Sequence, residues 1–204
     1  MLRSGIIGLV VMFCMPSLAQ YNIKRLLEQG QQSFSQGYYV ASMQIGMRIV
    51  GLKPDMYEAW YMMAKSKYNL DDFKGAANDS RRALLLQPYI PDIYDLYAMA
   101  CIKVGNYDSA IEAYTKALAL DKDNKTYLFN RAYCYFENGQ RKDAERELLA
   151  ITDRWKNFTQ AITLLDDIKH NKTPQKKIKS VLNIFVPTLK ITPNLHSLPL
   201  LPLK

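Results

Sequence analysis

Histidine is scarce in this chain of 204 residues, which holds only His170 and His196. Both lie at or beyond the end of the last helix that we predict, so the rest of the chain has no imidazole to act as a base, a relay or a metal ligand. The sequence also has no Gly-rich phosphate-binding motif and no Cys-x-x-Cys pair. Carboxylates are adjacent at Asp71-Asp72 and Asp166-Asp167, but neighbouring positions on a helix do not face each other. We therefore expect no catalytic residue, no metal and no cofactor, and we predict that the protein is not an enzyme.

Long apolar runs are also missing. The most apolar stretch, Ile6 to Met15, is shorter than the roughly 20 residues that a membrane-spanning helix needs. It follows Arg3 and precedes Ser17-Leu18-Ala19, which is the charged start, short apolar stretch and small-residue cleavage site of a secretory signal peptide. We predict a signal peptide over residues 1–19, cleaved after Ala19. The predicted location is exported, periplasmic or secreted, with a bacterial envelope favoured.

Acidic residues are absent from the end of the chain. From Ile168 to Lys204 there are seven Lys and no Asp or Glu, whereas the first 167 residues hold 20 Lys and Arg against 19 Asp and Glu. Nearly all of the formal charge of +8 therefore belongs to this end. A nucleic-acid-binding protein would carry its positive charge on the folded face that contacts phosphate. The near-neutral remainder argues against a nucleic-acid partner.

Small residues, in contrast, recur every 34 positions. Gly, Ala and Ser together make up 36 of the 204 residues, yet they fill two complete columns at this spacing. The first column is Gly30, Ala64, Ala98 and Ala132, and the second is Ser42, Ala76, Ala110 and Ala144. A looser column holds Gly37, Gly105 and Gly139, with Asp71 as the exception. Small residues let helices approach closely, and a Gly just past a helix can take the left-handed cap conformation. The pattern predicts a helix, a tight turn and a helix, four times.

These units resemble the tetratricopeptide repeat family. The second unit carries the family's pattern as Trp60, Ala64, Phe73, Ala76, Ala83 and Pro88, and the third as Tyr94, Ala98, Gly105, Tyr107, Ala110, Tyr114 and Ala117. The resemblance implies an all-α, right-handed superhelical solenoid over residues 20–171. Its repeats are expected at about 23–56, 57–90, 91–124 and 125–158, and a capping helix at 158–170 completes it.

The resemblance also implies that positions 2, 5, 9 and 12 of each unit line the concave side of the solenoid. We call these sixteen positions the inner face. They are Lys24, Leu27, Gln31, Phe34, Glu58, Tyr61, Lys65, Tyr68, Asp92, Asp95, Met99, Ile102, Thr126, Phe129, Tyr133 and Phe136. Large aromatic and aliphatic side chains of this kind anchor protein interfaces. The alternative is that some pack against neighbouring units, and we favour this core role for Phe34, Tyr68, Ile102 and Phe136, and a binding role for Tyr61, Phe129 and Tyr133.

Chaperone-binding members of the family hold carboxylates with a clamp of Lys, Asn and Arg. The matching positions here are Leu27, Gln31, Met62, Thr126 and Asn130. Because this cationic clamp is absent, a partner with apolar or aromatic side chains suits the surface better than an acidic chaperone tail. Cys101 and Cys134 lie on first helices of neighbouring units, whose axes are expected about 8–10 Å apart, so we predict two buried free thiols and no disulfide.

The tail, residues 172–204, holds five of the nine prolines, which exclude a continuing helix. It also has apolar stretches, so it is not the composition of ordinary disorder. Three interpretations stay open: an arm that docks on the solenoid or on a partner sheet, a basic tail near an anionic membrane surface, and a segment without function.

The function predicted from these observations is a non-enzymatic adaptor that holds a protein or peptide on its concave face in an envelope or extracytoplasmic assembly. A purely structural spacer with an empty or self-occupied groove is the alternative from another class. Tethering to a membrane surface through the tail is the third. The oligomeric state is not indicated.

Overall fold

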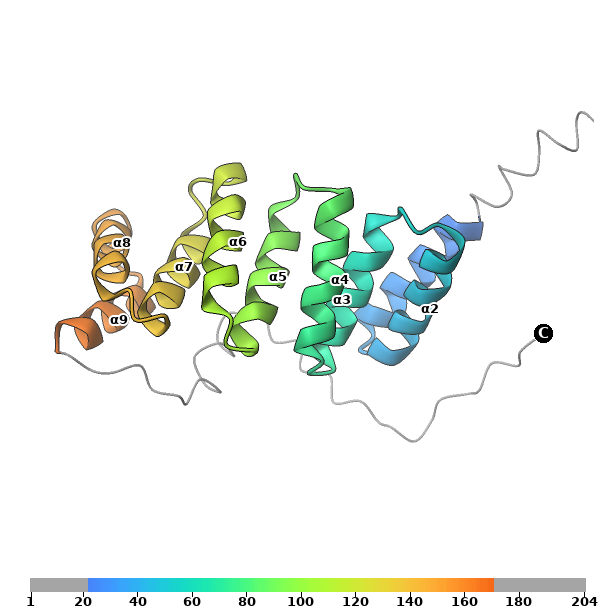
Figure 1. Cartoon of the computed structure of the whole chain (residues 1–204), viewed down its shortest axis with the longest axis horizontal. Helices are drawn as coiled ribbons and strands as arrows, with labels where there is room; N and C mark the ends of the chain where they lie inside the picture. Colours follow the sequence, from blue (N-terminus) through green and yellow to red (C-terminus); the bar gives the residue numbers. More distant parts are fainter. Residues whose placement is uncertain (1–21, 171–204) are drawn as a thin grey trace, which may run out of the picture.

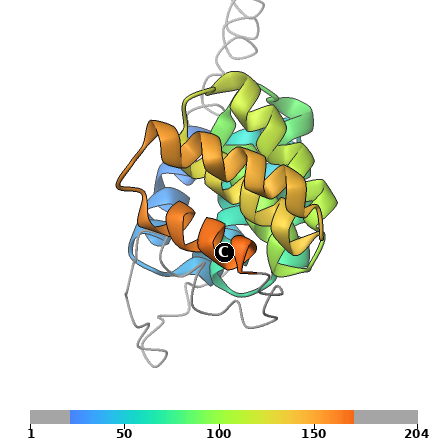
Figure 2. The same cartoon turned by 90° about the vertical axis from the view of Figure 1, so that its left-hand side faces the viewer.

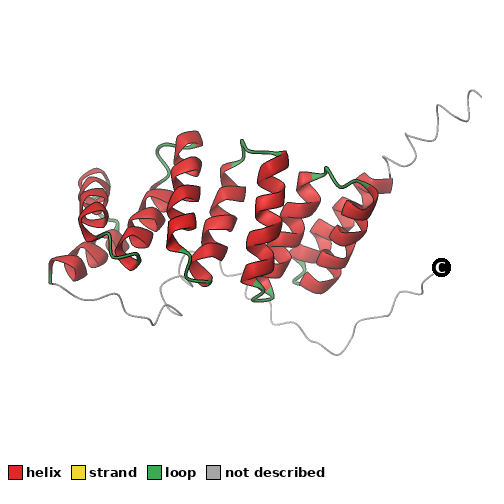
Figure 3. Ribbon diagram, in the orientation of Figure 1, coloured by secondary structure: helices red, strands yellow, loops and turns green. Residues whose placement is uncertain are grey.

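The computed structural model describes residues 22–170, and within this range every regular element is a helix (Figure 3). The predicted signal peptide and tail lie outside the described residues. A first helix over residues 22–35 is followed by eight more, which we give in chain order. They are α2 (Tyr39–Leu52), α3 (Tyr57–Asn69), α4 (Phe73–Leu86), α5 (Pro91–Lys103), α6 (Tyr107–Leu120), α7 (Lys125–Glu137), α8 (Arg141–Arg154) and α9 (Thr159–Lys169).

The helices stand side by side in chain order along the long axis of the molecule (Figure 1). From α2 to α9 each helix packs against the next, and α3 also contacts α5. Seen from the α9 end, the helix pairs lie one behind another (Figure 2). This is a superhelical solenoid of helical hairpins, as the 34-residue repeat predicts.

The tight turns inside the hairpins share one geometry. The φ angles of Gly37, Gly105 and Gly139 are 82°, 79° and 78°, and Asp71, at the matching place, has a φ of 61°. In each turn the next amide donates to a carbonyl five residues back, as from Asn106 N to Cys101 O at 2.9 Å. This is the left-handed helix cap that satisfies the last carbonyls of a helix, and it favours glycine because a Cβ crowds the backbone there.

Caps also begin several helices. The Asp72 carboxylate accepts from the backbone N–H of Gly75 at 2.9 Å, and the Asn106 side chain accepts from Ser109 N at 3.2 Å. Asn124 accepts from the amides of Thr126 and Tyr127. Each bond satisfies an amide that the helix itself leaves unpaired.

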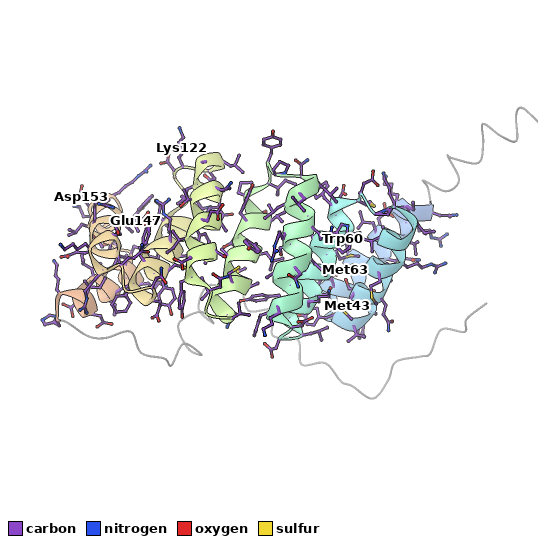
Figure 4. The ribbon with its side chains drawn as sticks, viewed as in Figure 1. Met43, Trp60, Met63, Lys122, Glu147 and Asp153 are labelled. Carbon is purple, nitrogen blue, oxygen red and sulfur yellow. The ribbon has the colours of Figure 1, made fainter. Side chains whose placement is uncertain are left out.

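Both columns of small residues are buried where helices approach. Ala64, Ala98, Ala132 and Ser42 are among the members with no exposed surface. At Gly30, an added Cβ would come within 2.6 Å of Met62 Cε, and at Gly46 it would overlap Met63 Cγ. Met63 and Trp60 belong to α3, and Figure 4 labels them in the same part of the view as Met43 of α2. The two glycines thus make room for methionine side chains from α3.

The core divides into three clusters along the stack. The central one runs from α4 to α7 around Tyr114, which has no exposed surface. A second joins α7, α8 and α9, and a third, centred on Ile49 and Met62, joins the first helix, α2 and α3. Because each hairpin buries its apolar side only against its neighbours, the core extends along the whole described length.

Two ion pairs cross between helices in places that are mostly buried. Lys67 of α3 contacts Asp79 of α4 at 2.7 Å, and Arg131 of α7 contacts Glu147 of α8 at 2.5 Å. Glu147, on α8, is labelled in Figure 4. The Arg131 guanidinium also donates to Thr115 Oγ1 at 3.1 Å, so it connects α6, α7 and α8.

The two described cysteines, Cys101 and Cys134, are buried free thiols. Burial raises the pKa of both. The two tryptophans lie near opposite ends of the stack. The Trp60 indole N–H donates to Pro54 O at 2.8 Å, and the Arg154 guanidinium lies 4.7 Å from the centre of the Trp155 ring.

The capping helix α9 buries Ala161, Leu165 and Ile168 against α8 and α7. The Ile162 side chain of the same helix, in contrast, is 44% exposed. The face that α9 presents to the stack is therefore narrower than the spacing of its apolar residues suggests. No helix between residues 22 and 170 is both long enough and apolar enough to span a bilayer.

Candidate functional site

The central part of the inner face brings together charged and aromatic side chains from three helices. The Lys65 ammonium of α3 lies 5.0 Å from the ring centre of Phe34, on the first helix, and 4.7 Å from that of Tyr61. These are cation–π distances, which favour a cation over the negative face of a ring. One lysine therefore joins the inner positions of the first two units.

Asp92 and Asp95 of α5 continue this surface towards α7. The Tyr127 hydroxyl donates to Asp92 Oδ1 at 3.1 Å, a contact between residues 35 positions apart. Burial raises the pKa of Tyr61 and of Tyr127, and for both the two aspartates raise it further. Both carboxylates thus act on tyrosines of α3 and α7.

Asp95 is the most perturbed carboxylate of this group. Burial raises its pKa to about 6, a hydrogen bond from Tyr114 opposes the shift, and the charge of Asp92 adds to it. The Tyr114 hydroxyl in turn accepts from Asn130 Nδ2 at 3.1 Å. Asp95 Oδ1 is buried and has no hydrogen-bond partner. A carboxylate in this state stays energetically costly as an anion unless a donor or a cation approaches it.

Lys65 and Tyr68 respond to the same surroundings. Burial lowers the pKa of Lys65, and the negative charge of Asp92 partly offsets this. Burial raises the pKa of Tyr68 to about 12, with Asp95 and then Asp71 as further causes. The Tyr68 ring also packs edge-on against Phe73 at 5.3 Å.

The predicted inner-face residues of the first units keep exposed surface, whereas most of those at the later end are buried. Leu27, Phe34, Tyr61, Lys65, Tyr68, Asp95 and Met99 are half-buried, and Gln31 is exposed. Ile102, Phe129, Tyr133 and Phe136 are buried, with exposed fractions of 4%, 3%, 8% and 6%. For Ile102 and Phe136 this matches the favoured core role, whereas Phe34 and Tyr68, for which the same role was favoured, are only half-buried.

For Phe129 and Tyr133, the exposure that a binding role requires is not there. Phe129 packs on Phe158, from the connection between α8 and α9, with ring centres 5.4 Å apart, and Tyr133 belongs to the central core cluster. Burial and the neighbouring Glu137 raise the pKa of Tyr133. The available part of the inner face therefore lies on the first helix, α3 and α5.

The sequence did not predict that Tyr127, Tyr114 and Asn130 take part in the inner face. Tyr127 occupies position 3 of its unit, which the resemblance does not place inward, and Tyr114 belongs to the second helix of its pair. Nothing in the repeat pattern signals that the hydroxyls of Tyr127 and Tyr114 meet Asp92 and Asp95, or that Asn130 donates to Tyr114. Two positions of the missing clamp are also buried: Met62 is 2% and Asn130 6% exposed.

Two cavities lie away from the inner face. One of about 350 Å³ lies between α7 and α8 beside Trp155, and one of about 330 Å³ lies among α4, α5 and α6 beside Leu85. Inner-face residues line neither. Among residues 22–170 no three His, Cys, Asp or Glu side chains gather as a metal site would require.

Residues 102–154 match the tetratricopeptide repeat family. Among solved structures, YrrB, described as a tetratricopeptide repeat protein with an unusual peptide-binding site, aligns at 14% identity over 72% of this chain and 76% of its own, with a TM-score of 0.67. MamA from Desulfovibrio magneticus RS-1 aligns at 14% identity over 74% of this chain and 86% of its own, with a TM-score of 0.67. The Yersinia enterocolitica type III secretion chaperone SycD, solved with a peptide of the translocator YopD, aligns at 22% identity over 56% of this chain and 93% of its own, with a TM-score of 0.52. Together the helical hairpins, the repeat match and these likenesses show that this chain has the tetratricopeptide repeat solenoid fold.

Proposed function

We propose that this protein is a non-enzymatic adaptor that binds a peptide or protein partner on its inner face. The observation that carries the proposal is the half-buried surface of Tyr61, Lys65, Tyr68 and Asp95, formed by successive first helices. Two of the likenesses, YrrB and SycD, are described as having a peptide-binding site or a bound peptide. Because this surface runs over successive first helices, it suits an extended partner.

The surface has the composition of a recognition site. Half-buried tyrosines bury large areas at small entropic cost when a partner covers them, and a lysine already held over two rings needs little further ordering. Asp95 and Asp92 add acceptors for a partner's N–H groups or cations. We expect the binding free energy to concentrate on Tyr61 and Tyr68, since tyrosines dominate such interfaces.

The test compares two Tyr→Ala variants. Tyr61→Ala removes an inner-face ring under the Lys65 ammonium, whereas the control Tyr89→Ala changes a 75% exposed tyrosine between α4 and α5. Partners are identified by cross-linking and mass spectrometry in the native cell fraction, and folding is checked by circular dichroism. Recovery of a partner should fall at least about tenfold for Tyr61→Ala, equivalent to about 1.4 kcal/mol. Equal recovery from both folded variants would reject the inner face as the binding surface.

A structural spacer is the second candidate. The buried fourth-unit positions favour it, because Phe129, Tyr133 and Phe136 are occupied by intramolecular packing. This role predicts that complexes assemble unchanged when Tyr61 is replaced.

We also propose that the protein acts outside the cytoplasm. The support is the apolar run Ile6 to Met15 followed by Ser17-Leu18-Ala19. Intact-mass measurement of the protein isolated from its native cells should give a chain that begins at Gln20. A chain that still carries residues 1–19 in the soluble cytoplasmic fraction would contradict the export.

A further inference from the structure

The centre of the inner face is acidic although the body of the protein is nearly neutral. Residues 22–170 hold 20 Lys and Arg and 19 Asp and Glu. At the inner positions of α3 and α5, however, Glu58, Asp92 and Asp95 stand against Lys65 alone. The surface that would receive a partner is therefore negative at its centre.

The positive charge of Lys65 is already engaged. Its ammonium lies over the rings of Phe34 and Tyr61, at 5.0 and 4.7 Å from their centres. The nearby Asp92, in contrast, is exposed to solvent. Asp92 accepts one hydrogen bond, from Tyr127, and a carboxylate has room for several donors. Asp95 beside it has a buried oxygen without a partner. This arrangement favours a guest that brings a cation between tyrosine rings.

The chain itself contains a segment with the complementary chemistry. Residues 171–204 hold six Lys, no Arg, no Asp and no Glu, together with the apolar stretch Val181 to Val186. This segment follows α9 directly in the sequence. At about 3.3 Å per extended residue, the 20 residues 171–190 have a contour length of about 66 Å, which is enough to pass the six helix spacings of about 8–10 Å from α9 back to α3.

We propose that residues 176–190, reached through residues 171–175, bind in cis to the inner face over α3 and α5, with lysine side chains beside Asp92 and Asp95 and apolar side chains against the tyrosines. The proposal rests on the proposed function of this face as a peptide-binding surface and names its first occupant. A tethered segment acts at an effective concentration of the order of mM, so weak contacts suffice to occupy the surface. A foreign partner would then have to displace it.

The test is zero-length carbodiimide cross-linking of the full-length protein, which joins a lysine amine to a carboxylate in direct contact. Peptide mass spectrometry should find Lys176, Lys177, Lys179 or Lys190 joined to Asp92 within monomers. Asp92→Asn should remove these links at least about tenfold, because the amide cannot react while still accepting from Tyr127. The matched control is Asp153→Asn on α8, whose side chain is 85% exposed, and it should leave them unchanged.

A second variant keeps the folded body intact. Replacing Lys176, Lys177 and Lys179 by Glu reverses the charge outside the described helices, and this should abolish links from the remaining tail lysines to Asp92. High salt should also reduce them, since part of the attraction is between exposed charges.

Three outcomes would overturn the proposal. Links spread evenly over exposed carboxylates such as Asp153 would show no docking. In a mixture of isotopically labelled and unlabelled chains, links that form only between a labelled and an unlabelled chain would assign the surface to a second copy. Binding of the tail to anionic vesicles with Asp92 unlinked would assign it to a membrane. If any of these occurs while Tyr61→Ala still loses a foreign partner, the cis proposal fails and the adaptor function stands.

Discussion

Among single residues, Asp95 links the chemistry of the inner face to stability. Its pKa is about 6 in the folded chain against an ordinary 3.8, with burial as the main cause. Between these values the folded state holds the proton more tightly than the unfolded state does. The free energy of unfolding contributed by Asp95 must therefore fall as the pH rises from about 4 to about 6, because ionisation is disfavoured in the folded chain.

Asp95→Asn should remove this pH dependence. The variant keeps an oxygen that can accept from Tyr114, and it removes the charge that forms near neutral pH. Relative to the parent protein, it should be more stable at pH 7.5 than at pH 4.5 by roughly 1–3 kcal/mol, the equivalent of a shift of one to two pKa units. Urea unfolding at the two pH values measures this difference.

Asp153→Asn serves as the control, because the Lys156 ammonium lowers the pKa of Asp153 and its side chain is exposed. It should give no such gain at high pH. An Asp95→Asn protein whose advantage is the same at both pH values would show that the carboxylate is not perturbed as the structure indicates.

At the scale of the helix, the contact of α2 with α3 depends on a missing side chain. Gly46 lies inside α2, where a Cβ would overlap Met63 Cγ and come within 3.5 Å of the Ala59 carbonyl oxygen. Gly51, in the same helix, has nothing within 4 Å of the corresponding position. Substitutions at Gly46 and Gly51 therefore distinguish the effect of helix propensity from the effect of packing.

Gly51→Ala should stabilise the protein by up to about 1 kcal/mol, since alanine favours a helix over glycine. Gly46→Ala has the same propensity gain but forces Met63 to move, and overpacking typically costs about 1–3 kcal/mol. We expect a net loss of about 1 kcal/mol and a lower Tm, measured by circular dichroism. A Tm raised equally by both substitutions would show that the close approach is not limiting.

The repeat spacing was enough to predict the fold, because each column has one physical role. The Gly column predicts the left-handed turns, and Asp71 adopts the same conformation because the rest of the turn requires it. The burial of Phe129 and Tyr133 could not be predicted, since periodicity identifies a helix face but not what covers it. Phe158, from the connection before α9, supplies that cover for Phe129.

Only part of the candidate site could be predicted from the sequence, because the repeat pattern does not specify contacts between units. Tyr61, Lys65, Tyr68 and Asp95 lie at inner positions that the resemblance implies. The contact of Tyr127 with Asp92 joins two units, and its partners are 35 positions apart at non-equivalent places in their repeats. Such a contact depends on the exact rotation between neighbouring hairpins, which no local pattern specifies.

At the scale of the whole molecule, the described chain is a one-dimensional stack. The most extensive helix contacts run between chain neighbours, and the core separates into three successive clusters. Stability in such a stack is approximately a sum over units and their interfaces. The Arg131 contacts with Glu147 and Thr115 add a polar connection across three helices at the later end.

The placement of the two tryptophans gives each end of this stack its own optical reporter. Trp60 is fixed by its bond to Pro54 before α3, and Trp155 lies under the Arg154 guanidinium after α8. Replacing either one with phenylalanine leaves a single tryptophan, which can be excited selectively over the tyrosines and whose emission reports the local unfolding of one half. Comparing the two emission curves would then reveal whether the halves melt together or in sequence.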